Sequence, residues 1–369
     1  MTGGAGFIGQ HLSKRLVRLG NEVRILDSLD PQVHGDPSAV RRATKTEPGR
    51  EMIVGDVRSP ADVKRAIEGV DVIFHEAAAV GVGQSMYQIR RYVDVNCMGT
   101  ANILDILVNE EHDVKKLVVA SSNTVYGEGR YTCPRCGRVS PGMRPLEQLE
   151  KRDWELYCPR CGSRVEPAPT DEEKPLSPTS VYAATKMEQE QLALQVGKAY
   201  GLPVVVLRYF NVLGPGQSLK NPYTGICAIF SSRIRSGRPP IIYEDGLQTR
   251  DLVSVHDVVQ ANVLAMETRA MDMEVFNVGT GRPTTILYVA EKLIQLHRSP
   301  LRPEVSGRFR KGDIRHCYAD ISKIARHGYS PSYTSEKAIE EFYAWSLGQE
   351  AEDLFEEAER EMDERGLVV

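Results

Sequence analysis

The sequence lacks an excess of basic residues. Its 369 residues include 46 Lys and Arg against 50 Asp and Glu, a formal net charge of −4. Non-specific binding to nucleic acid depends on clustered Lys and Arg, so the composition argues against a nucleic-acid partner. An apolar run near the ~20 residues that span a bilayer is also missing, as are the basic and apolar segments of a secretory signal. We therefore expect a cytoplasmic protein with no membrane partner.

A disulfide framework is the next class that the composition disfavours. The seven cysteines are an odd number in a long chain, whereas disulfide scaffolds are short and carry paired cysteines. Hydrophobic residues make up 41% and charged residues 26%, as in ordinary globular proteins. The length suggests about two domains.

Short apolar runs alternate with helical patterns over the first two-thirds of the chain. The strand-like runs lie at residues 22–26, 51–54, 70–75, 116–120 and 203–207, and the helical stretches at 8–19, 60–68, 94–109 and 182–200. Runs of Val, Ile and Leu with little alternation suit parallel strands that are buried on both faces. The alternation predicts an α/β fold with a doubly wound parallel sheet.

This pattern also divides the chain. We assign residues 1–207 to a nucleotide-binding domain, interrupted by an insertion at 130–168 that has four Cys and no apolar period. Residues 208–335, with their Pro- and Gly-rich loops, form mainly a smaller α/β substrate lobe. Residues 336–369 are predicted to form a charged, solvated C-terminal helix.

A glycine-rich loop opens the sequence, with Gly3, Gly6 and Gly9 directly before a helical pattern. Such a loop lets backbone N–H groups approach a pyrophosphate at a helix N-terminus. Asp27 ends the next strand, where a carboxylate can accept both hydroxyls of an adenosine ribose and repel a 2′-phosphate. This combination favours NAD over NADP. Taken alone, the glycines are compatible with a plain turn and Asp27 with a solvated strand end.

The strand that should precede this loop is missing, because the motif begins at residue 2. That strand would lie in the middle of the sheet. Its absence predicts unpaired backbone groups and a gap in the core that costs several kcal/mol. Our hypothesis is that the working protein has several more apolar residues upstream. Mass spectrometry of the native protein tests this, and an active, stable enzyme that starts at Met1 would contradict it.

A catalytic pair is suggested by Tyr182 and Lys186, which share one face of a helix. We expect the ammonium to lower the pKa of the phenol, so that Tyr182 can act as a general base on a hydroxyl group. Ser122 ends a buried strand at the edge where sheets of this type bind ligands, and it can contact the same oxygen. The alternatives are an incidental surface pattern for Tyr182 and Lys186 and turn chemistry for Ser122.

The insertion carries two C-P-R-C-G pentapeptides with 21 residues between the cysteine pairs. Four thiolates at about this spacing, those of Cys133, Cys136, Cys158 and Cys161, predict a closed, structural zinc site. A redox-active pair of disulfides is the alternative. Because the insertion lies between Ser122 and Tyr182, we expect a lid or an oligomer contact that shapes the substrate pocket. If C136S leaves turnover, affinity and assembly unchanged, the insertion has no such role.

Several motifs together resemble the extended short-chain dehydrogenase/reductase family, and most closely its nucleotide-sugar 4-epimerases. They are TGGAGFIG, the LD that ends at Asp27, GDV, SSNTVYG, the stretch from Asn96 to Thr100, YAATK and LRYFNVLGPGQ, and they cover roughly residues 1–320. The resemblance implies a Rossmann-type fold, tightly bound NAD, a nucleotide-sugar substrate and a homodimer built on the helices at 94–109 and 182–200.

The resemblance also implies roles for individual residues. Catalysis falls to Ser122, Tyr182 and Lys186. NAD binding falls to Gly3, Gly6, Phe7, Ile8, Gly9, Asp27, Asp56, Val57, Ala77, Ala78, Ala79 and Asn96, together with Tyr182 and Lys186. Substrate binding falls to Ser85, Ser122, Asn123, Asn211, Arg250, Arg310 and Asp313, in which the arginines suit a diphosphate because their planar forks bind two oxygens at once.

The reaction is narrowed by the two residues after Ser122. Family dehydratases have Asp-Glu there as an acid and base pair, and family decarboxylases tend to keep a Glu, whereas this sequence has Asn123 and Thr124. Redox epimerisation at C4 through a 4-keto sugar needs no such pair. The stretches LDSLDPQVHGD and VGVGQSMYQIRRYVDVN and the cysteine insertion are similar to epimerases of dTDP-L-rhamnose. A UDP-sugar 4-epimerase, another nucleotide-sugar oxidoreductase or dehydratase, and a non-catalytic NAD-sensing regulator are the alternatives.

Overall fold

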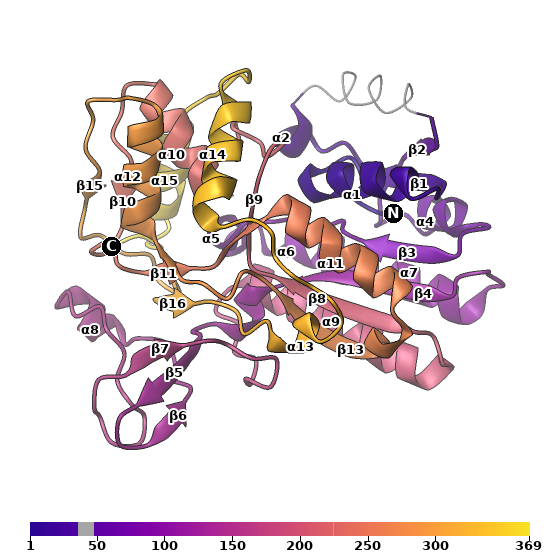
Figure 1. Ribbon diagram of the computed structural model, residues 1–369, viewed down its shortest axis with the longest axis horizontal. Coiled ribbons are helices and arrows are strands. Elements are labelled where there is room, and N and C mark those ends of the chain that lie inside the picture. Colours follow the sequence, from indigo (N-terminus) through magenta and orange to yellow (C-terminus); the bar gives the residue numbers. More distant parts are fainter. Residues whose placement is uncertain (36–47, 224) are drawn as a thin grey trace.

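The computed structural model describes residues 1–35, 48–223 and 225–369, and its centre is a twisted parallel sheet (Figure 1). Four strands pair in the order β13-β8-β4-β3, and β1 pairs with β2 on the other side of the N-terminus. Every pairing among these six strands is parallel. The predicted α/β fold with a parallel sheet is confirmed. The strands are β1 (Val23–Asp27), β2 (Arg50–Val54), β3 (Val72–His75), β4 (Lys116–Ser122), β8 (Val204–Tyr209) and β13 (Glu274–Val278).

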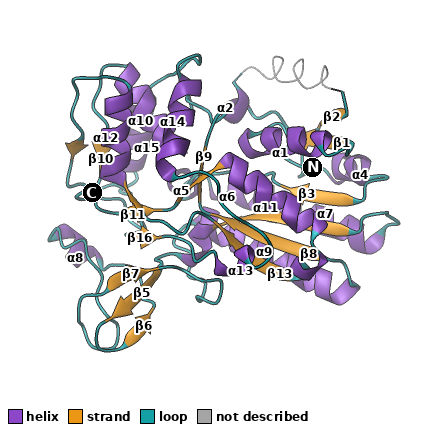
Figure 2. Ribbon diagram, in the orientation of Figure 1, coloured by secondary structure: helices purple, strands orange, loops and turns teal. Residues whose placement is uncertain are grey.

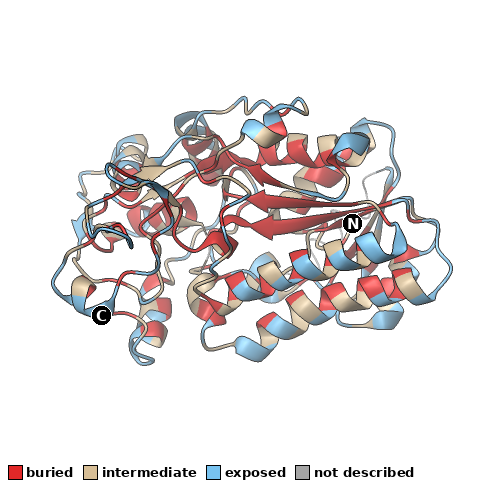
Figure 3. Cartoon of the chain, turned by 90° about the horizontal axis from the view of Figure 1, so that it is seen from below, coloured by how far each residue is buried: buried red, intermediate tan, exposed pale blue. Residues whose placement is uncertain are grey.

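Helices cover both faces of this sheet (Figure 2). On one face lie α1 (Phe7–Arg18) and α11 (Val255–Glu267), and on the other α4 (Pro60–Ile67), α7 (Gly99–Asn109) and α9 (Val181–Tyr200). Strand residues alternate between the two cores: Val118 packs with the first pair of helices, and Val119 with the second group. Figure 3 shows these strands as the buried centre of the molecule. Because both faces are covered, the strands are apolar throughout, as the sequence indicates.

Only two residues stand where the first strand of such a sheet belongs. The Thr2 N–H donates to the Phe74 carbonyl at 2.9 Å, and the Met1 carbonyl accepts from the Leu26 N–H at 2.8 Å. Beyond Met1, a cleft of about 620 Å³ lies between the ends of β1 and β3, lined among others by Val23, Val72 and Met1. The predicted gap in the core is therefore present. The terminal amine itself is desolvated there, which lowers its pKa to about 5.

A second lobe is built on three helices, α10 (Ile226–Arg235), α12 (Ile286–Leu296) and α14 (Ser335–Ser346), which enclose a core of their own. The chain crosses back to the main sheet through α11 and β13, so residues 208–335 are shared between the two lobes. The expected solvated C-terminal helix is wrong in two respects. The segment forms two helices, α14 and α15 (Phe355–Asp363), and α14 buries Ile339 and Phe342 completely.

The cysteine-containing insertion forms a small antiparallel sheet of its own, which projects from the body below the second lobe in Figure 1. Its strands are β5 (Arg130–Cys133), β6 (Gly137–Val139) and β7 (Glu166–Ala168), in the order β6-β5-β7. A short helix, α8 (Leu146–Glu150), follows β6. Tyr131 and Leu156 are among the residues of its small buried core.

The remaining elements are short. Helical segments are α2 (Pro31–His34), α5 (Val82–Ser85), α6 (Ile89–Tyr92), η1 (Val93–Met98), η2 (Asn123–Tyr126), η3 (Arg269–Met271) and α13 (Ser322–Ala325). Short strands are β9 (Asn211–Leu213), β10 (Ile241–Ile242), β11 (Thr249–Arg250), β12 (Leu252–Ser254), β14 (Thr284–Thr285), β15 (Glu304–Val305) and β16 (His316–Cys317). Among the described residues, none of the helices has the length and apolar character needed to cross a bilayer.

Candidate active site

The glycine loop forms a close-packed cradle between β1 and β3. Gly3 has a φ of +67°, and a Cβ at this position would lie 2.7 Å from the Ala77 nitrogen. A Cβ on Gly9 would lie 2.4 Å from the Gly3 carbonyl oxygen. Side chains are therefore excluded at both positions, and Gly6 caps the N-terminus of α1 without any side chain. Phe7 and Ile8 begin the helix, so its free N–H groups face the loop, as pyrophosphate binding requires.

Asp27 lies beside this loop at the end of β1. Its carboxylate accepts from the Ala5 N–H at 3.0 Å and from the Leu29 N–H at 2.9 Å. The ring of His34, which the sequence analysis did not single out, also lies 3.3 Å from it. A carboxylate has about four lone-pair sites, so it can still accept from a ribose. A cradle that admits only glycine, with a carboxylate at its rim, fits the adenosine half of NAD.

The other residues expected around NAD line the ends of β2 and β3. Val57 is buried against Gly99, and Asp56 pairs with Arg58 at 2.6 Å. Ala77, Ala78 and Ala79 follow β3 after one intervening residue, Glu76.

Asn96 joins this alanine segment to the helix that carries the catalytic residues. Its side chain accepts from the Ala79 N–H at 2.8 Å and donates to the Ala79 carbonyl at 3.1 Å and to the Thr185 hydroxyl at 2.9 Å. It is completely buried and lies in η1, a π-helical turn of a kind often found at functional sites. These hydrogen bonds fix the position of α9 relative to the segment after β3.

Ser122, Tyr182 and Lys186 come together at the carboxyl end of β4. All three are buried, and the Ser122 hydroxyl, which accepts from Thr124 at 2.9 Å, lies close enough to the Tyr182 phenol to lower its pKa. The Lys186 ammonium donates to the Ala120 carbonyl at 2.7 Å and to Gln189 at 2.8 Å. The arrangement places a phenol and a hydroxyl side by side at the ligand-binding edge of the sheet.

The expected effect of Lys186 on the pKa of Tyr182 is not what the structure shows. Burial raises the pKa of the phenol to about 12, and the hydrogen bond with Ser122 only partly opposes this. Burial likewise lowers the pKa of Lys186 to about 8, because its charge is poorly solvated. Its hydrogen bonds to Ala120 and Gln189 tie the ammonium to β4 and to its own helix. The side chain therefore acts first in positioning α9.

The residues expected to bind substrate lie on both lobes. Ser85 is buried and donates to the Val82 carbonyl, and Asn123 is buried next to Ser122. Asn211 has a buried side-chain oxygen with no protein partner, so it is available to a ligand. The Arg250 guanidinium is occupied by three backbone carbonyls, those of Thr249, Ile314 and Arg315, at 2.8–3.1 Å. It braces the loop before β16 in this structure.

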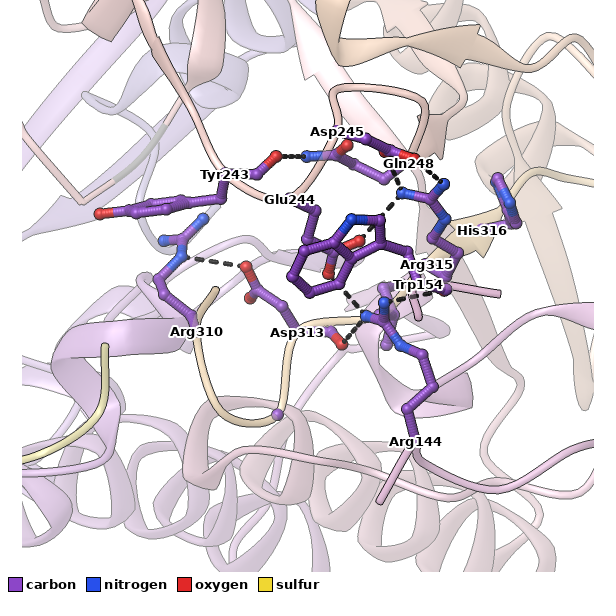
Figure 4. A network of polar contacts seen from close by, with 12 residues as sticks. Arg144, Trp154, Tyr243, Glu244, Asp245, Gln248, Arg310, Asp313, Arg315 and His316 are labelled. Atoms are coloured by element: carbon purple, nitrogen blue, oxygen red, sulfur yellow. Dashed lines mark hydrogen bonds and ion pairs between the residues drawn. The ribbon is translucent and has the colours of Figure 1, made fainter. Parts of the chain in front are cut away.

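Arg310 and Asp313 lie together on the loop before β16. The guanidinium and carboxylate are 3.0 Å apart, and Arg310 stacks over the ring of Tyr243 with 5.0 Å between the guanidinium carbon and the ring centre. Figure 4 shows this pair beside a larger network of charged residues. The same loop borders a small cleft that also touches Ser180, two residues before Tyr182.

Sequence reasoning missed Glu76, which lies between β3 and the alanine segment. Its carboxylate accepts from the Tyr209 hydroxyl at 2.8 Å. The hydroxyl oxygen of Tyr209 in turn accepts from the Asn262 side chain at 2.7 Å. Desolvation raises the pKa of Glu76 to about 7. A lone Glu inside the apolar stretch VDVIFHEAAAV is the signal that could have found it. It is the titratable group nearest in sequence to the segment expected at the nicotinamide.

The four cysteines of the insertion also come together. Their sulfur atoms all lie within 4.8 Å of one another. Backbone N–H groups of Arg135 and Arg160 each point at a sulfur, that of Cys133 and that of Cys158, at 3.4 Å. Gly137 and Gly162, one after each pair, have φ near +70° and so need to be glycine. Four gathered sulfurs with N–H···S contacts match the donor set of a tetrahedral metal site.

Known proteins of the same kind cover almost the whole chain. The NAD dependent epimerase/dehydratase family matches residues 160–279, and the 3-beta hydroxysteroid dehydrogenase/isomerase family matches residues 1–134. A dTDP-L-rhamnose 4-epimerase of Burkholderia thailandensis is 38% identical over 348 residues, covering 94% of this chain and 93% of that protein. The chain belongs to the NAD-dependent epimerase/dehydratase family.

Solved structures of this epimerase/dehydratase family show the same arrangement of the chain. UDP-glucose 4-epimerase of Thermus thermophilus, in complex with NAD, has a TM-score of 0.73 at 27% identity over 95% of this chain and 98% of its own. That of Thermotoga maritima, with UDP-glucose, has a TM-score of 0.75 at 27% identity over 94% and 97%. The protein is thus an NAD-dependent enzyme of the extended short-chain dehydrogenase/reductase type, and an isomerase, as these 4-epimerases are.

Proposed function

We propose that the protein interconverts the C4 epimers of a nucleotide sugar and that its substrate is dTDP-L-rhamnose. The observation that supports the reaction is the buried pair of Ser122 and Tyr182 at the carboxyl end of β4, with the Arg310 loop bordering a cleft beside Ser180. The similarity to the Burkholderia enzyme supports the sugar.

The chemistry is a proton transfer coupled to a reversible oxidation. Tyr182 takes the proton of the C4 hydroxyl, and Ser122 holds that oxygen in place. When bound, NAD supplies the acceptor for the C4 hydride, returns it to the other face, and in its oxidised form brings a positive charge that favours the phenolate. Lys186 keeps α9 anchored to β4 throughout. The 4-keto sugar turns over within the site before Tyr182 gives the proton back.

The side chains after Ser122 favour this reaction over an elimination. Asn123 and Thr124 do not titrate near neutral pH, and Thr124 already donates to the Ser122 hydroxyl at 2.9 Å. A dehydratase needs an acid and a base at this edge. Glu76, which directly follows β3, already accepts a hydrogen bond from the Tyr209 hydroxyl.

The surroundings of the small cleft support a 6-deoxy sugar. The cleft has a volume of about 20 Å³, and its border combines polar side chains, among them Thr179 and Lys311, with four apolar ones, those of Val82, Met86, Met362 and Leu367. Rhamnose has a methyl group at C5 where glucose has a hydroxymethyl group. An apolar border contacts a methyl group without leaving a hydroxyl group unpaired.

We further propose that the insertion binds one structural zinc ion. Tetrahedral Zn–S bonds of about 2.3 Å require sulfur atoms about 3.8 Å apart, and the observed separations of up to 4.8 Å fit this. Metal analysis of purified protein should give one zinc per chain, which the C136S variant loses.

The proposed assembly is a homodimer through the helices at 94–109 and 182–200. Ile89, Val93 and Met98 support it, because these three apolar side chains are exposed at the start of the first of them. Their replacement by Ser should yield monomers in analytical ultracentrifugation if the proposal holds.

The test of the proposed function needs no added cofactor. Purified protein is incubated with dTDP-β-L-rhamnose while NMR follows the H4 signals of the sugar. A second set of signals that grows to equilibrium supports the reaction, the substrate and retained NAD together. Conversion of UDP-sugars alone would keep the reaction and reject rhamnose. Failure with every nucleotide sugar would reject the reaction.

A further inference from the structure

One arginine of the insertion binds its own insertion and two further segments of the chain. The Arg144 guanidinium donates to the Trp154 carbonyl at 3.0 Å, to the Glu244 carboxylate at 2.8 Å and to the Asp313 carbonyl at 3.0 Å. Its side chain is 2% exposed. Figure 4 shows the guanidinium pointing from the insertion into the second lobe. The acceptor at Asp313 belongs to the loop that carries Arg310.

A second buried arginine, Arg315 at the end of that loop, completes the junction. It is fully buried and donates to Glu244 at 2.9 Å, to both oxygens of Asp245 at 2.6 and 2.8 Å, and to Glu155 of the insertion at 2.9 Å. Its backbone N–H donates to Glu128 at 2.7 Å. The two guanidiniums therefore share Glu244, which itself has a strained φ of +56°.

Apolar packing reinforces the same contact. The Trp154 ring lies 6.0 Å from that of Phe309, one residue before Arg310, and both are buried. Buried charges are stable only when their partners stay in place, so this junction fixes the loop far more firmly than an exposed ion pair would. A planar guanidinium can reach all three acceptors of Arg144 at once, whereas an ammonium cannot.

Every insertion residue in these contacts, apart from Glu128 at its base, lies between the two cysteine pairs. Arg144, Trp154 and Glu155 all belong to the segment 137–157 that Cys136 and Cys158 enclose. A cross-link between the pairs closes this segment into a short loop and removes much of its conformational freedom. A metal bound by the cysteine cluster would therefore limit the motion of the segment that carries Arg144, Trp154 and Glu155.

We infer that the insertion positions the nucleotide-binding loop, with Arg144 and Arg315 as positioning residues for Arg310 and Asp313. This inference rests on the proposed function and on the role that the family resemblance implies for Arg310 and Asp313, which is to bind the nucleoside diphosphate of the substrate. The insertion then sets the affinity for the nucleotide half of the substrate and leaves the proton transfer at Tyr182 alone.

The test measures nucleotide affinity and turnover separately on intact, NAD-loaded protein. Calorimetry gives the Kd for dTDP, and kinetics give KM and kcat for dTDP-L-rhamnose. For R144K we expect a Kd and KM at least tenfold higher, with kcat within twofold and an unchanged NAD content. C136S should shift the Kd in the same direction. E155A removes a partly exposed partner of Arg315 and should raise the Kd for dTDP about threefold. This variant replaces R144K in the test if R144K does not fold.

The matched control is R130K. Arg130 lies in the same insertion and pairs with Asp171 at 2.7 Å, but its partners all belong to residues 140–171. The Kd of the R130K variant for dTDP should equal that of the wild type. Folded R144K and E155A proteins with wild-type Kd overturn the inference, as does a fall in kcat at unchanged KM. Wild-type protein that neither binds dTDP nor epimerises the sugar counts against the proposed function instead.

Discussion

At the scale of single residues, burial decides how the catalytic side chains behave. The phenol of Tyr182 is held protonated by its surroundings, and Ser122 is the hydrogen-bond partner that opposes this. The Lys186 ammonium donates its hydrogen bonds to residues of β4 and α9. The base function therefore depends on groups that stabilise the phenolate during turnover.

This gives a pH prediction for catalysis. Because the deprotonated phenol is the active form and its pKa is raised to about 12, kcat/KM should rise with pH from about 6 and still be rising at about 9. S122A should move the rising limb to higher pH, since the hydrogen bond that lowers the pKa of Tyr182 is lost, and Y182F should reduce kcat by at least about 10³-fold. Rate profiles over that pH range, with NAD content checked for each variant, measure both effects. A profile that is flat in the wild type contradicts the assignment of Tyr182 as base.

Glu76 gives a prediction about stability. Its pKa is about 7 in the folded protein against 4.5 in the unfolded chain, so the folded state binds more protons between these values. Its contribution to stability is full below pH 4.5 and is lost as pH rises through 7. E76Q keeps an acceptor for Tyr209, so relative to the wild type it should gain about 1–2 kcal/mol on going from pH 5 to pH 8. Urea unfolding of both proteins at the two pH values tests this, and an equal difference at both would argue against it.

Candidate site residues could be identified from the sequence only where they belong to a recognisable motif. Gly3, Gly9 and Tyr182 belong to patterns whose spacing reflects a local backbone requirement, so the sequence was sufficient. Glu76 has no such pattern, because its environment comes from Tyr209 and Asn262, far away in the chain. The pKa of Tyr182 is raised, whereas the sequence predicted a lowered pKa. The spacing of Tyr182 and Lys186 carries no information about the desolvation of the phenol.

At the scale of elements, the strands of the main sheet were predictable and the connections between them were not. Runs such as 116–120 stand out because both faces of the sheet are covered. β13 was missed, since its partner β8 lies 69 residues earlier in the chain. The burial of α14 was missed as well, because its charged residues dominate the pattern while Ile339 and Phe342 alone make the core contact.

Asn96 offers a test of how elements are held together. N96A removes three buried hydrogen bonds between the segment after β3 and α9, and it leaves the Ala79 N–H without a partner. We expect a loss of about 2–4 kcal/mol in the free energy of unfolding and a faster release of NAD. Denaturant titration and NAD fluorescence after gel filtration measure the two effects. The control is N109A, whose side chain bonds only within its own exposed helix end.

At the scale of the whole molecule, the cleft beside Met1 is the weakest part of the sheet. The ends of β1 and β3 border it, and the desolvated terminal amine, whose pKa is lowered to about 5, donates to the Arg24 carbonyl at its edge. An engineered N-terminal extension of four or five apolar, β-branched residues should fill the cleft as a strand between them. We expect the extension to raise the melting temperature by several degrees. A Gly-Ser extension of equal length is the control, and equal melting temperatures for the two would contradict the strand.

The junction around Arg144 has a consequence for motion. The insertion is covalently part of the chain between Ser122 and Tyr182, on the nucleotide-binding body, yet it is bonded to Glu244 and Asp313 of the second lobe. It therefore bonds the two lobes directly to each other. With these bonds in place we expect the two lobes to keep their relative positions, so that a ligand enters by displacing smaller segments beside the cleft, such as Met362 and Leu367.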